Sequence, residues 1–176
     1  MIKNVLLLIL ISASLAWGQT NKQDSTWLPL KHFIGNWKGN GTGESGPGRY
    51  ERSYQFILNN SFIEIRNKST YPPNDKHPKG EVHEDLGYFI YDRNKHTFLL
   101  RQFHVEGFVN DYVLDSISQD KKTLVFATSA IVNIPDGWQA KETYRLLSHN
   151  EFEEIFELAP PGKPFYIYSR VKLVRQ

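Results

Sequence analysis

The residues best suited to chemistry are charged and aromatic side chains that share a face with bulky apolar ones. In residues 50–58, which alternate in polarity, Arg52 and Tyr54 lie on the apolar face. By the same alternation Glu142, Tyr144 and Glu154 lie on the apolar faces of later segments. Because such a face is normally turned to the core of a sheet protein, these side chains are expected inside the molecule.

The segment 98–115, FLLRQFHVEGFVNDYVLD, adds further candidates. A two-residue turn at Glu106-Gly107 would fold it into a hairpin. In that register Arg101, Phe103 and Tyr112 share one bulky face, which is expected to point inward. Burial of an unpaired guanidinium is costly, so Arg101 would need a buried partner or a ligand.

Two arginines and two glutamates in one interior allow two interpretations. The charges can pair with one another and with buried water, which would leave a packed barrel acting only as an interaction module. Alternatively, the interior is a cavity in which an arginine holds the polar or anionic head of a ligand and the aromatic wall holds its apolar body. The second interpretation predicts ligand contacts from Arg52, Tyr54, Arg101, Phe103, Tyr112, Glu142, Tyr144 and Glu154.

An enzyme is the alternative from a different functional class. His104 and Glu106 are two residues apart near the hairpin tip and could act as an acid/base pair for proton transfer. Glu142 and Glu154 could form a second pair of this kind. A surface histidine beside a turn is the plainer interpretation of His104, and no catalytic residue is assigned.

Metal and disulfide chemistry have little support in the sequence. Glu81, His83 and Asp85 alternate along one side of an expected strand, a spacing open to metal ligation. That side is expected to be exposed, and no metal site is predicted. The chain has no cysteine, which excludes disulfides and thiolate zinc sites.

The elements that must position these side chains are strands. From Tyr50 onward, segments of alternating polarity are separated by short turns, with almost no helical periodicity. A turn at Asn59-Asn60 sets a register in which Arg52 faces Asn67. About ten such strands predict an all-β fold, a single antiparallel up-and-down barrel, because closure removes the unpaired edges.

The N-terminal region differs from the rest of the chain. Residues 1–18 have a basic start, an apolar centre and a small-x-small end, which predicts a signal peptide. The mature protein is therefore expected to be exported, periplasmic or extracellular, with no membrane span. Residues 19–33 are expected to form a lead-in that plugs one end of a barrel built from 34–176. The glycine-rich residues 39–43 are expected to form a flexible loop at a strand end.

The composition suits one domain of this kind. A chain of 176 residues with 40% hydrophobic and 14% aromatic content can bury a core of its own. The formal charge of +2 is spread along the chain, so nucleic acid is not expected as a partner. We expect a monomer or homodimer that binds a small apolar or amphipathic ligand.

The sequence resembles a family of small exported bacterial proteins with a calycin-like barrel, related to lipocalins, fatty-acid-binding proteins and nitrobindins. The resemblance rests on Gly35-Asn36-Trp37 and, more specifically, on the central run RQFHVEGFVN at 101–110. It implies the barrel and no particular activity. A nitrobindin relation would imply haem held by a histidine on the final strand. Residues 165–175 contain none, and Tyr166 and Tyr168 are expected to face outward, so no cofactor is predicted.

Overall fold

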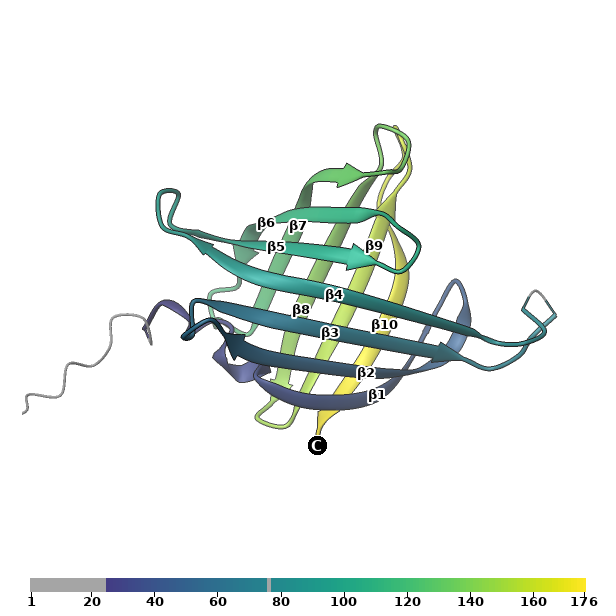
Figure 1. Ribbon diagram of the computed structural model, residues 1–176, viewed down its shortest axis with the longest axis horizontal. Helices are drawn as coiled ribbons and strands as arrows, with labels where there is room; N and C mark the ends of the chain where they lie inside the picture. The colour runs from purple at the N-terminus through teal and green to yellow at the C-terminus, as the bar shows by residue number, and fades with distance from the viewer. Residues whose placement is uncertain (1–24, 76) are drawn as a thin grey trace, which may run out of the picture.

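Ten strands wind in chain order into one closed antiparallel barrel, in which β1 pairs with both β2 and β10 (Figure 1). The computed structural model describes residues 25–75 and 77–176. The expected all-β, up-and-down barrel is confirmed. The elements are the 3-10 helix η1 (Lys31–Phe33) and the strands β1 (Gly35–Gly43), β2 (Gly46–Ile57), β3 (Phe62–Tyr71), β4 (Glu81–Asp92), β5 (Thr97–His104), β6 (Val109–Ile117), β7 (Thr123–Val132), β8 (Gln139–Ser148), β9 (Glu151–Ala159) and β10 (Tyr166–Arg175).

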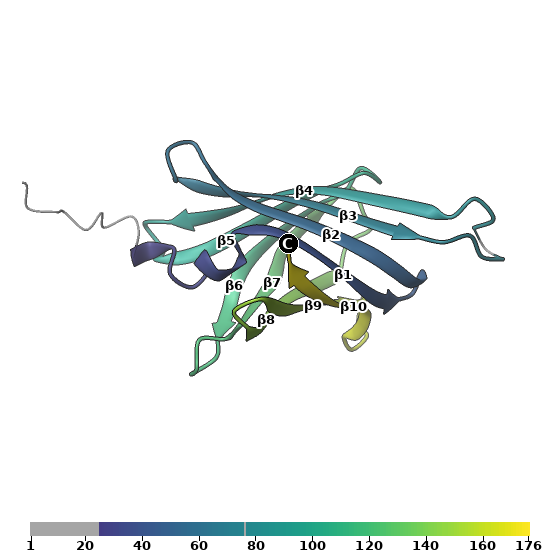
Figure 2. The same ribbon diagram turned by 90° about the horizontal axis from the view of Figure 1, so that it is seen from below.

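The lead-in segment closes one end of the barrel (Figure 2). Three of its large apolar side chains, Trp27, Leu30 and Phe33, are buried in the core, whereas Leu28 is exposed. The indole N–H of Trp37 donates to the Phe33 carbonyl at 2.7 Å, and the Arg175 guanidinium lies 4.1 Å from the centre of the Trp37 ring. These contacts join the lead-in to the first and last strands. The expected signal peptide, 1–18, lies outside the described residues, among which no helix has the length and apolarity to cross a membrane.

Aromatic rings fill the half of the barrel next to this plug. Neighbouring rings have their centres 5.0 to 6.5 Å apart, mostly in edge-to-face or tilted arrangements. Burial of large aromatic side chains at this density is a main source of stability. The rings belong to Phe33, Tyr54, Phe89, Phe126, Tyr144 and Phe152.

Two hairpins have the register that the sequence predicts. In β2 and β3, Arg52 lies opposite Asn67. In β8 and β9, Tyr144 lies opposite Glu154. The β2–β3 turn contains Asn59 at a φ of 55°, a left-handed conformation that asparagine tolerates better than most residues. Turn chemistry and alternation therefore agree in these hairpins.

The β5–β6 hairpin has a longer turn than the sequence predicts. The amide of His104 donates to the Phe108 carbonyl at 3.1 Å, so three residues, 105–107, form the connection. Gly107 closes it with a φ of 92°, the left-handed position of a three-residue hairpin loop. Because side chains alternate with a period of two, one extra residue in the turn moves every β5 side chain to the opposite face.

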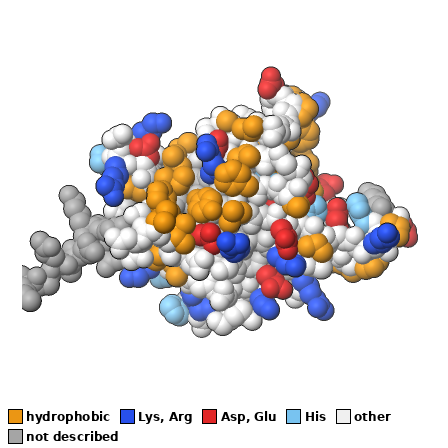
Figure 3. Space-filling model, viewed as in Figure 1, with side chains coloured by type: hydrophobic (Ala, Val, Ile, Leu, Met, Phe, Trp, Pro, Cys, Tyr) orange, Lys and Arg blue, Asp and Glu red, His pale blue; other side chains and the backbone are white. Residues whose placement is uncertain are grey.

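Arg101 and Phe103 consequently point outward, and the inward placement predicted for them is wrong. The Arg101 guanidinium binds Asp111 on the surface, with an Nη2–Oδ2 distance of 2.9 Å. Phe103 is 41% exposed, and Figure 3 shows hydrophobic side chains gathered over β4 to β6 on the outer face of the barrel. Both faces of β5 are therefore apolar, and polarity alternation alone could not decide which one is buried.

The glycine-rich residues 39–43 are strand and not loop. They pair along their whole length with β10, which closes the barrel. A Cβ atom on Gly39 would lie 1.9 Å from the Lys172 carbonyl oxygen. The alternate glycines are required because the two backbones approach too closely at this seam for any side chain to fit.

Candidate functional site

The end of the barrel opposite the plug contains a cavity of about 530 Å³. This volume lies within the range of about 300–1,000 Å³ that is usual for small-molecule sites. One wall is apolar and the floor is polar. The apolar wall consists mainly of Phe108, Ile131, Ile134, Pro135, Trp138 and Phe156.

A buried ion pair lies in the floor of this pocket. Arg52 donates from Nη2 to Glu154 Oε1 at 2.7 Å and from Nε to both oxygens of the same carboxylate at 3.1 Å. Its Nη1 donates to the backbone carbonyls of Glu51 and Lys68 at 3.0 and 3.2 Å. All three nitrogens of Arg52 are therefore engaged. Burial lowers the pKa of Arg52, but the Glu154 carboxylate more than offsets this, and the pKa stays above its ordinary value.

Glu142 is the second buried acid of the floor. Its side chain is buried, and Oε2 has no hydrogen-bond partner among the described residues. Burial raises the pKa of Glu142 well above its usual range, the Glu154 carboxylate adds to this shift, and Arg52 opposes it. The protonated, neutral form of Glu142 is therefore favoured.

Two asparagines contribute further acceptor atoms to the pocket. Asn67 Oδ1 and Asn110 Oδ1 are both buried, and neither has a partner in the described part of the chain. Buried polar atoms normally find partners. The free amide oxygens of the floor can thus accept hydrogen bonds, and the neutral carboxyl of Glu142 can both accept and donate.

The predicted tyrosines lie deeper than the pocket. Tyr54 donates to Glu154 Oε2 at 3.4 Å, and the hydroxyl of Tyr112 accepts a hydrogen bond from Asn110 Nδ2 at 2.9 Å. Burial raises the pKa of Tyr54, Tyr112 and Tyr144 well above their usual range, so all three are neutral phenols. They support the floor from below. Of the eight predicted contact residues, the pocket is lined by Arg52, Glu142 and Glu154.

The rim of the pocket carries two histidine–carboxylate contacts. His104 Nδ1 lies 2.7 Å from Asp85 Oδ1, and His83 Nδ1 is bonded to Glu106 Oε1. His83 Nε2 also lies 3.2 Å from Glu81 Oε1. His104 and Glu106, the predicted acid/base pair, come within 4.8 Å of each other, but each has a different hydrogen-bond partner. Burial lowers the pKa of His83, whereas its carboxylate partners more than offset this and leave it raised.

The sequence did not predict that β4 would contribute to this rim. In the β3–β4 register Asp85 lies opposite the buried Asn67, and His83 lies opposite Ser69. Glu81, His83 and Asp85 consequently lie on the inner face of β4 and not on the exposed side expected for them, and His83 and Asp85 line the pocket. The sequence would have indicated this face if the β3–β4 register, which places Asp85 opposite the inward Asn67, had been known.

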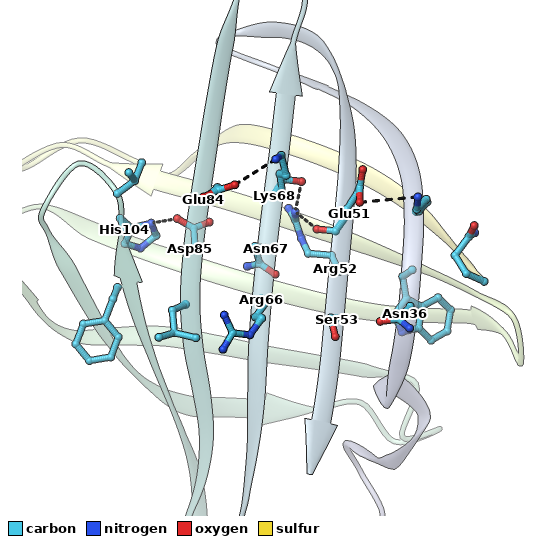
Figure 4. A pocket seen from close by; sticks show the side chains of 16 residues that line it. Asn36, Glu51, Arg52, Ser53, Arg66, Asn67, Lys68, Glu84, Asp85 and His104 are labelled. Atoms are coloured by element: carbon cyan, nitrogen blue, oxygen red, sulfur yellow. Dashed lines mark hydrogen bonds and ion pairs between the residues drawn. The ribbon is translucent and has the colours of Figure 1, made fainter. Parts of the chain in front are cut away.

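A second depression, of about 820 Å³, crosses the outer face of β1 to β5. Figure 4 shows its charged row, in which Lys38 pairs with Glu51 at 3.9 Å and Lys68 with Glu84 at 3.2 Å. These side chains are about half exposed and neutralise one another, and Arg66 pairs with Glu64 at 2.8 Å, so the lysines and arginines among the described residues that line the depression are already paired. The figure also shows His104 bonded to Asp85.

A bulge in β10 changes which side chains of the last strand face the pocket. The register shifts between Ile167 and Ser169, so that Tyr168 and Ser169 both line the pocket while Ile167 is exposed. The outward placement predicted for Tyr168 is therefore wrong. Burial raises the pKa of Tyr168, which disfavours the phenolate that would ligate haem iron. The last strand does not fit the haem ligand that a nitrobindin relation implies.

Comparison with solved structures finds several matches. The crystal structure of Rv2717c from M. tuberculosis matches with a TM-score of 0.64 at 18% sequence identity, over 86% of this chain and 97% of that one. This likeness shows the fold alone. A de novo designed fluorescence-activating β-barrel matches with a TM-score of 0.43 at 15% identity, over 83% and 95% of the two chains. A DUF3598-family protein of unknown function from Nostoc punctiforme matches with a TM-score of 0.28 at 8% identity, over 86% and 99%.

No protein-family model matches the sequence, and no curated protein matches it significantly.

Proposed function

We propose that the protein binds a small amphipathic molecule in the pocket at the open end of the barrel. The apolar body of the ligand would contact the wall that contains Phe108, Trp138 and Phe156. Its polar end would carry hydrogen-bond donors that reach the floor. The observation that carries this proposal is the pair of unpartnered side-chain oxygens beneath the apolar wall, on Asn67 and Glu142.

An anionic head group has less support than a donor-bearing one. Among the described residues that line the pocket, Arg52 is the one lysine or arginine. Its three nitrogens are already bonded to Glu154 and to backbone carbonyls. Arg101, the other predicted head-group contact, lies outside the barrel. A ligand carboxylate would therefore have to displace Glu154, whereas an amine, amide or hydroxyl would use the free oxygens.

We further propose that binding takes place outside the cytoplasm. The support is the sequence of residues 1–18, which has the charge, apolar centre and end expected of a signal peptide. The ligand would then be one that the protein meets in the periplasm or the surrounding medium.

A pair of fluorescent probes that differ only at the head group tests the ligand class. Dansylcadaverine ends in an amine and 6-(dansylamino)hexanoic acid ends in a carboxylate, on spacers of similar length. We expect the amine to bind at least about tenfold more tightly, a difference of about 1.4 kcal/mol. Equal or tighter binding of the acid would refute the assignment of a donor-bearing ligand.

Two matched variants locate the probe. Ser169→Phe places a bulky side chain in the pocket, whereas Ser116→Phe adds the same group at an exposed position of β6. Loss of probe binding in the first variant alone is the expected result. Retained binding in Ser169→Phe would place the ligand elsewhere. Native mass spectrometry of the purified protein, followed by organic extraction, would then identify any natural ligand.

A further inference from the structure

Three side chains at the pocket rim bring metal-ligating atoms together. Asp85 on β4, His104 on β5 and Glu106 in the β5–β6 turn place one ligand atom each within 4.8 Å of the other two. We propose that these three residues bind a divalent transition-metal ion. The proposal goes beyond the binding of an organic ligand and does not depend on it.

The distances require only small side-chain movements. Bonds of about 2.1 Å in a tetrahedral site place neighbouring ligand atoms about 3.4 Å apart. His104 Nδ1 and Asp85 Oδ1, now 2.7 Å apart, would separate slightly to admit the ion. Glu106, whose side chain is 40% exposed in a turn, would move toward them.

The charge of the rim favours a cation. The carboxylates of Glu81, Asp85 and Glu106 have no lysine or arginine nitrogen within 4.0 Å among the described residues, and their ionic partners are histidines. Three carboxylates in so small a region favour a bound positive ion.

Asn110 supplies an independent observation that points to the same ion. This side chain is only 1% exposed, and its Oδ1 has no partner among the described residues, while its Nδ2 lies 3.2 Å from His104 Nε2 and 2.9 Å from the Tyr112 hydroxyl. A half-turn of the amide would present Oδ1 to two natural donors, the Nε2–H of His104 and the O–H of Tyr112.

That arrangement would change what His104 offers on its other side. With the proton on Nε2, Nδ1 carries a lone pair that faces the Asp85 carboxylate. Two acceptors 2.7 Å apart repel each other unless a proton or a metal ion lies between them. A metal ion bound to Nδ1 would resolve the contact between His104 and Asp85 in the arrangement that gives Asn110 Oδ1 its partners.

The neighbours of the three ligands are those that metal sites usually have. Asn110 contacts the far nitrogen of His104, and His83 is hydrogen-bonded to Glu106. Outer hydrogen bonds of this kind orient metal ligands. Three protein ligands leave a coordination position open toward the pocket, and a set of one nitrogen and two oxygens suits Zn²⁺ and related first-row ions.

Calorimetric titration of the purified protein with Zn²⁺ tests the site. We expect one ion per chain, and at least about tenfold weaker binding in Glu106→Gln, whose position in an exposed turn leaves the packing of the barrel unchanged. Glu84→Gln is the matched control, because Glu84 neighbours Asp85 on β4 but pairs with Lys68 on the outer face. Absence of stoichiometric binding, or equal weakening in both variants, would overturn the proposal.

A second variant and a spectroscopic readout separate this site from surface histidines. Asp85→Asn should weaken Zn²⁺ binding as Glu106→Gln does, and Co²⁺ should give visible d–d absorption that both variants lose. Unchanged Zn²⁺ affinity in both variants would place the ion elsewhere and also overturn the proposal. The titration contains no dansyl probe, so its failure leaves the proposed ligand pocket standing, and failure of the probe experiment leaves the metal site standing.

Discussion

Replacement of Arg52 by methionine tests the account of the buried charges most directly. The change removes the guanidinium but keeps most of the side-chain length. Glu154, which is 6% exposed, would retain one side-chain hydrogen bond among the described residues, from the Tyr54 hydroxyl at 3.4 Å. Removal of one partner from a buried ion pair costs about 3–5 kcal/mol, because the remaining charge stays desolvated without compensation. We expect the free energy of unfolding to fall by about 4 kcal/mol.

The double variant Arg52→Met/Glu154→Gln separates pairing from burial. Each single variant leaves one member of the pair without its partner, whereas the double variant removes both charges. Its destabilisation should therefore be smaller than the sum of the two single effects, by about 2 kcal/mol.

Equilibrium unfolding in urea, followed by tryptophan fluorescence, measures these differences. Trp27 and Trp37 are both buried in the folded state, so their emission reports exposure on unfolding. With a slope of about 2 kcal/mol/M, a loss of about 4 kcal/mol lowers the urea midpoint by about 2 M. Additive single effects, or a loss below about 1 kcal/mol in Arg52→Met, would refute the description of a dry and mutually dependent pair.

Three further predictions concern pH, the closing seam and the surface. Burial keeps the pKa of Glu142 in the folded state above its value of about 4.3 in the unfolded state. The free energy of unfolding of the wild type should therefore fall by up to about 1.4 kcal/mol per pH unit as the pH rises from the unfolded-state pKa to the folded-state pKa. Urea unfolding from pH 4 to 8 should therefore show Glu142→Gln becoming progressively more stable than wild type, and parallel profiles would contradict this. Gly39→Ala should lower the free energy of unfolding by about 2–3 kcal/mol, because the added Cβ would lie 1.9 Å from a backbone oxygen. Gly46→Ala is the control: its Cβ would have no atom within 4 Å, and its positive φ should cost about 1 kcal/mol. Equal losses of stability in thermal unfolding would exclude the clash. Arg101→Ala should change urea stability by less than about 1 kcal/mol, because its ion pair is on the surface, and a loss of several kcal/mol would be inconsistent with that position.

The sequence was informative wherever two local signals agreed. Around Asn59 and across β8–β9, turn residues and polarity alternation indicated the same register, and both hairpins have it. The inward positions of Arg52, Glu142 and Glu154 follow from those registers. Local agreement of this kind is reliable because a one-residue slip would expose the whole apolar face.

Elsewhere the local signals were ambiguous. Both faces of β5 are apolar, so the choice depended on whether the turn after His104 contains two residues or three. The glycines of 39–43 look like a loop until the backbone of β10 lies against them, and the bulge at Tyr168 has no marker in polarity. Each of these features depends on contacts with another strand or turn, which polarity alternation within one strand does not predict.

The sequence by itself thus determined the barrel, the order of its strands and the burial of a charged pair, because alternation with a period of two and short turns act over neighbouring residues. Tertiary structure alone decided which part of the interior is open. The lead-in and the aromatic rings fill one half, while the other remains a pocket with a rim of His83, Asp85, His104 and Glu106. Those four residues come from two strands and a turn, and only the closure and shear of the barrel bring their side chains to one end.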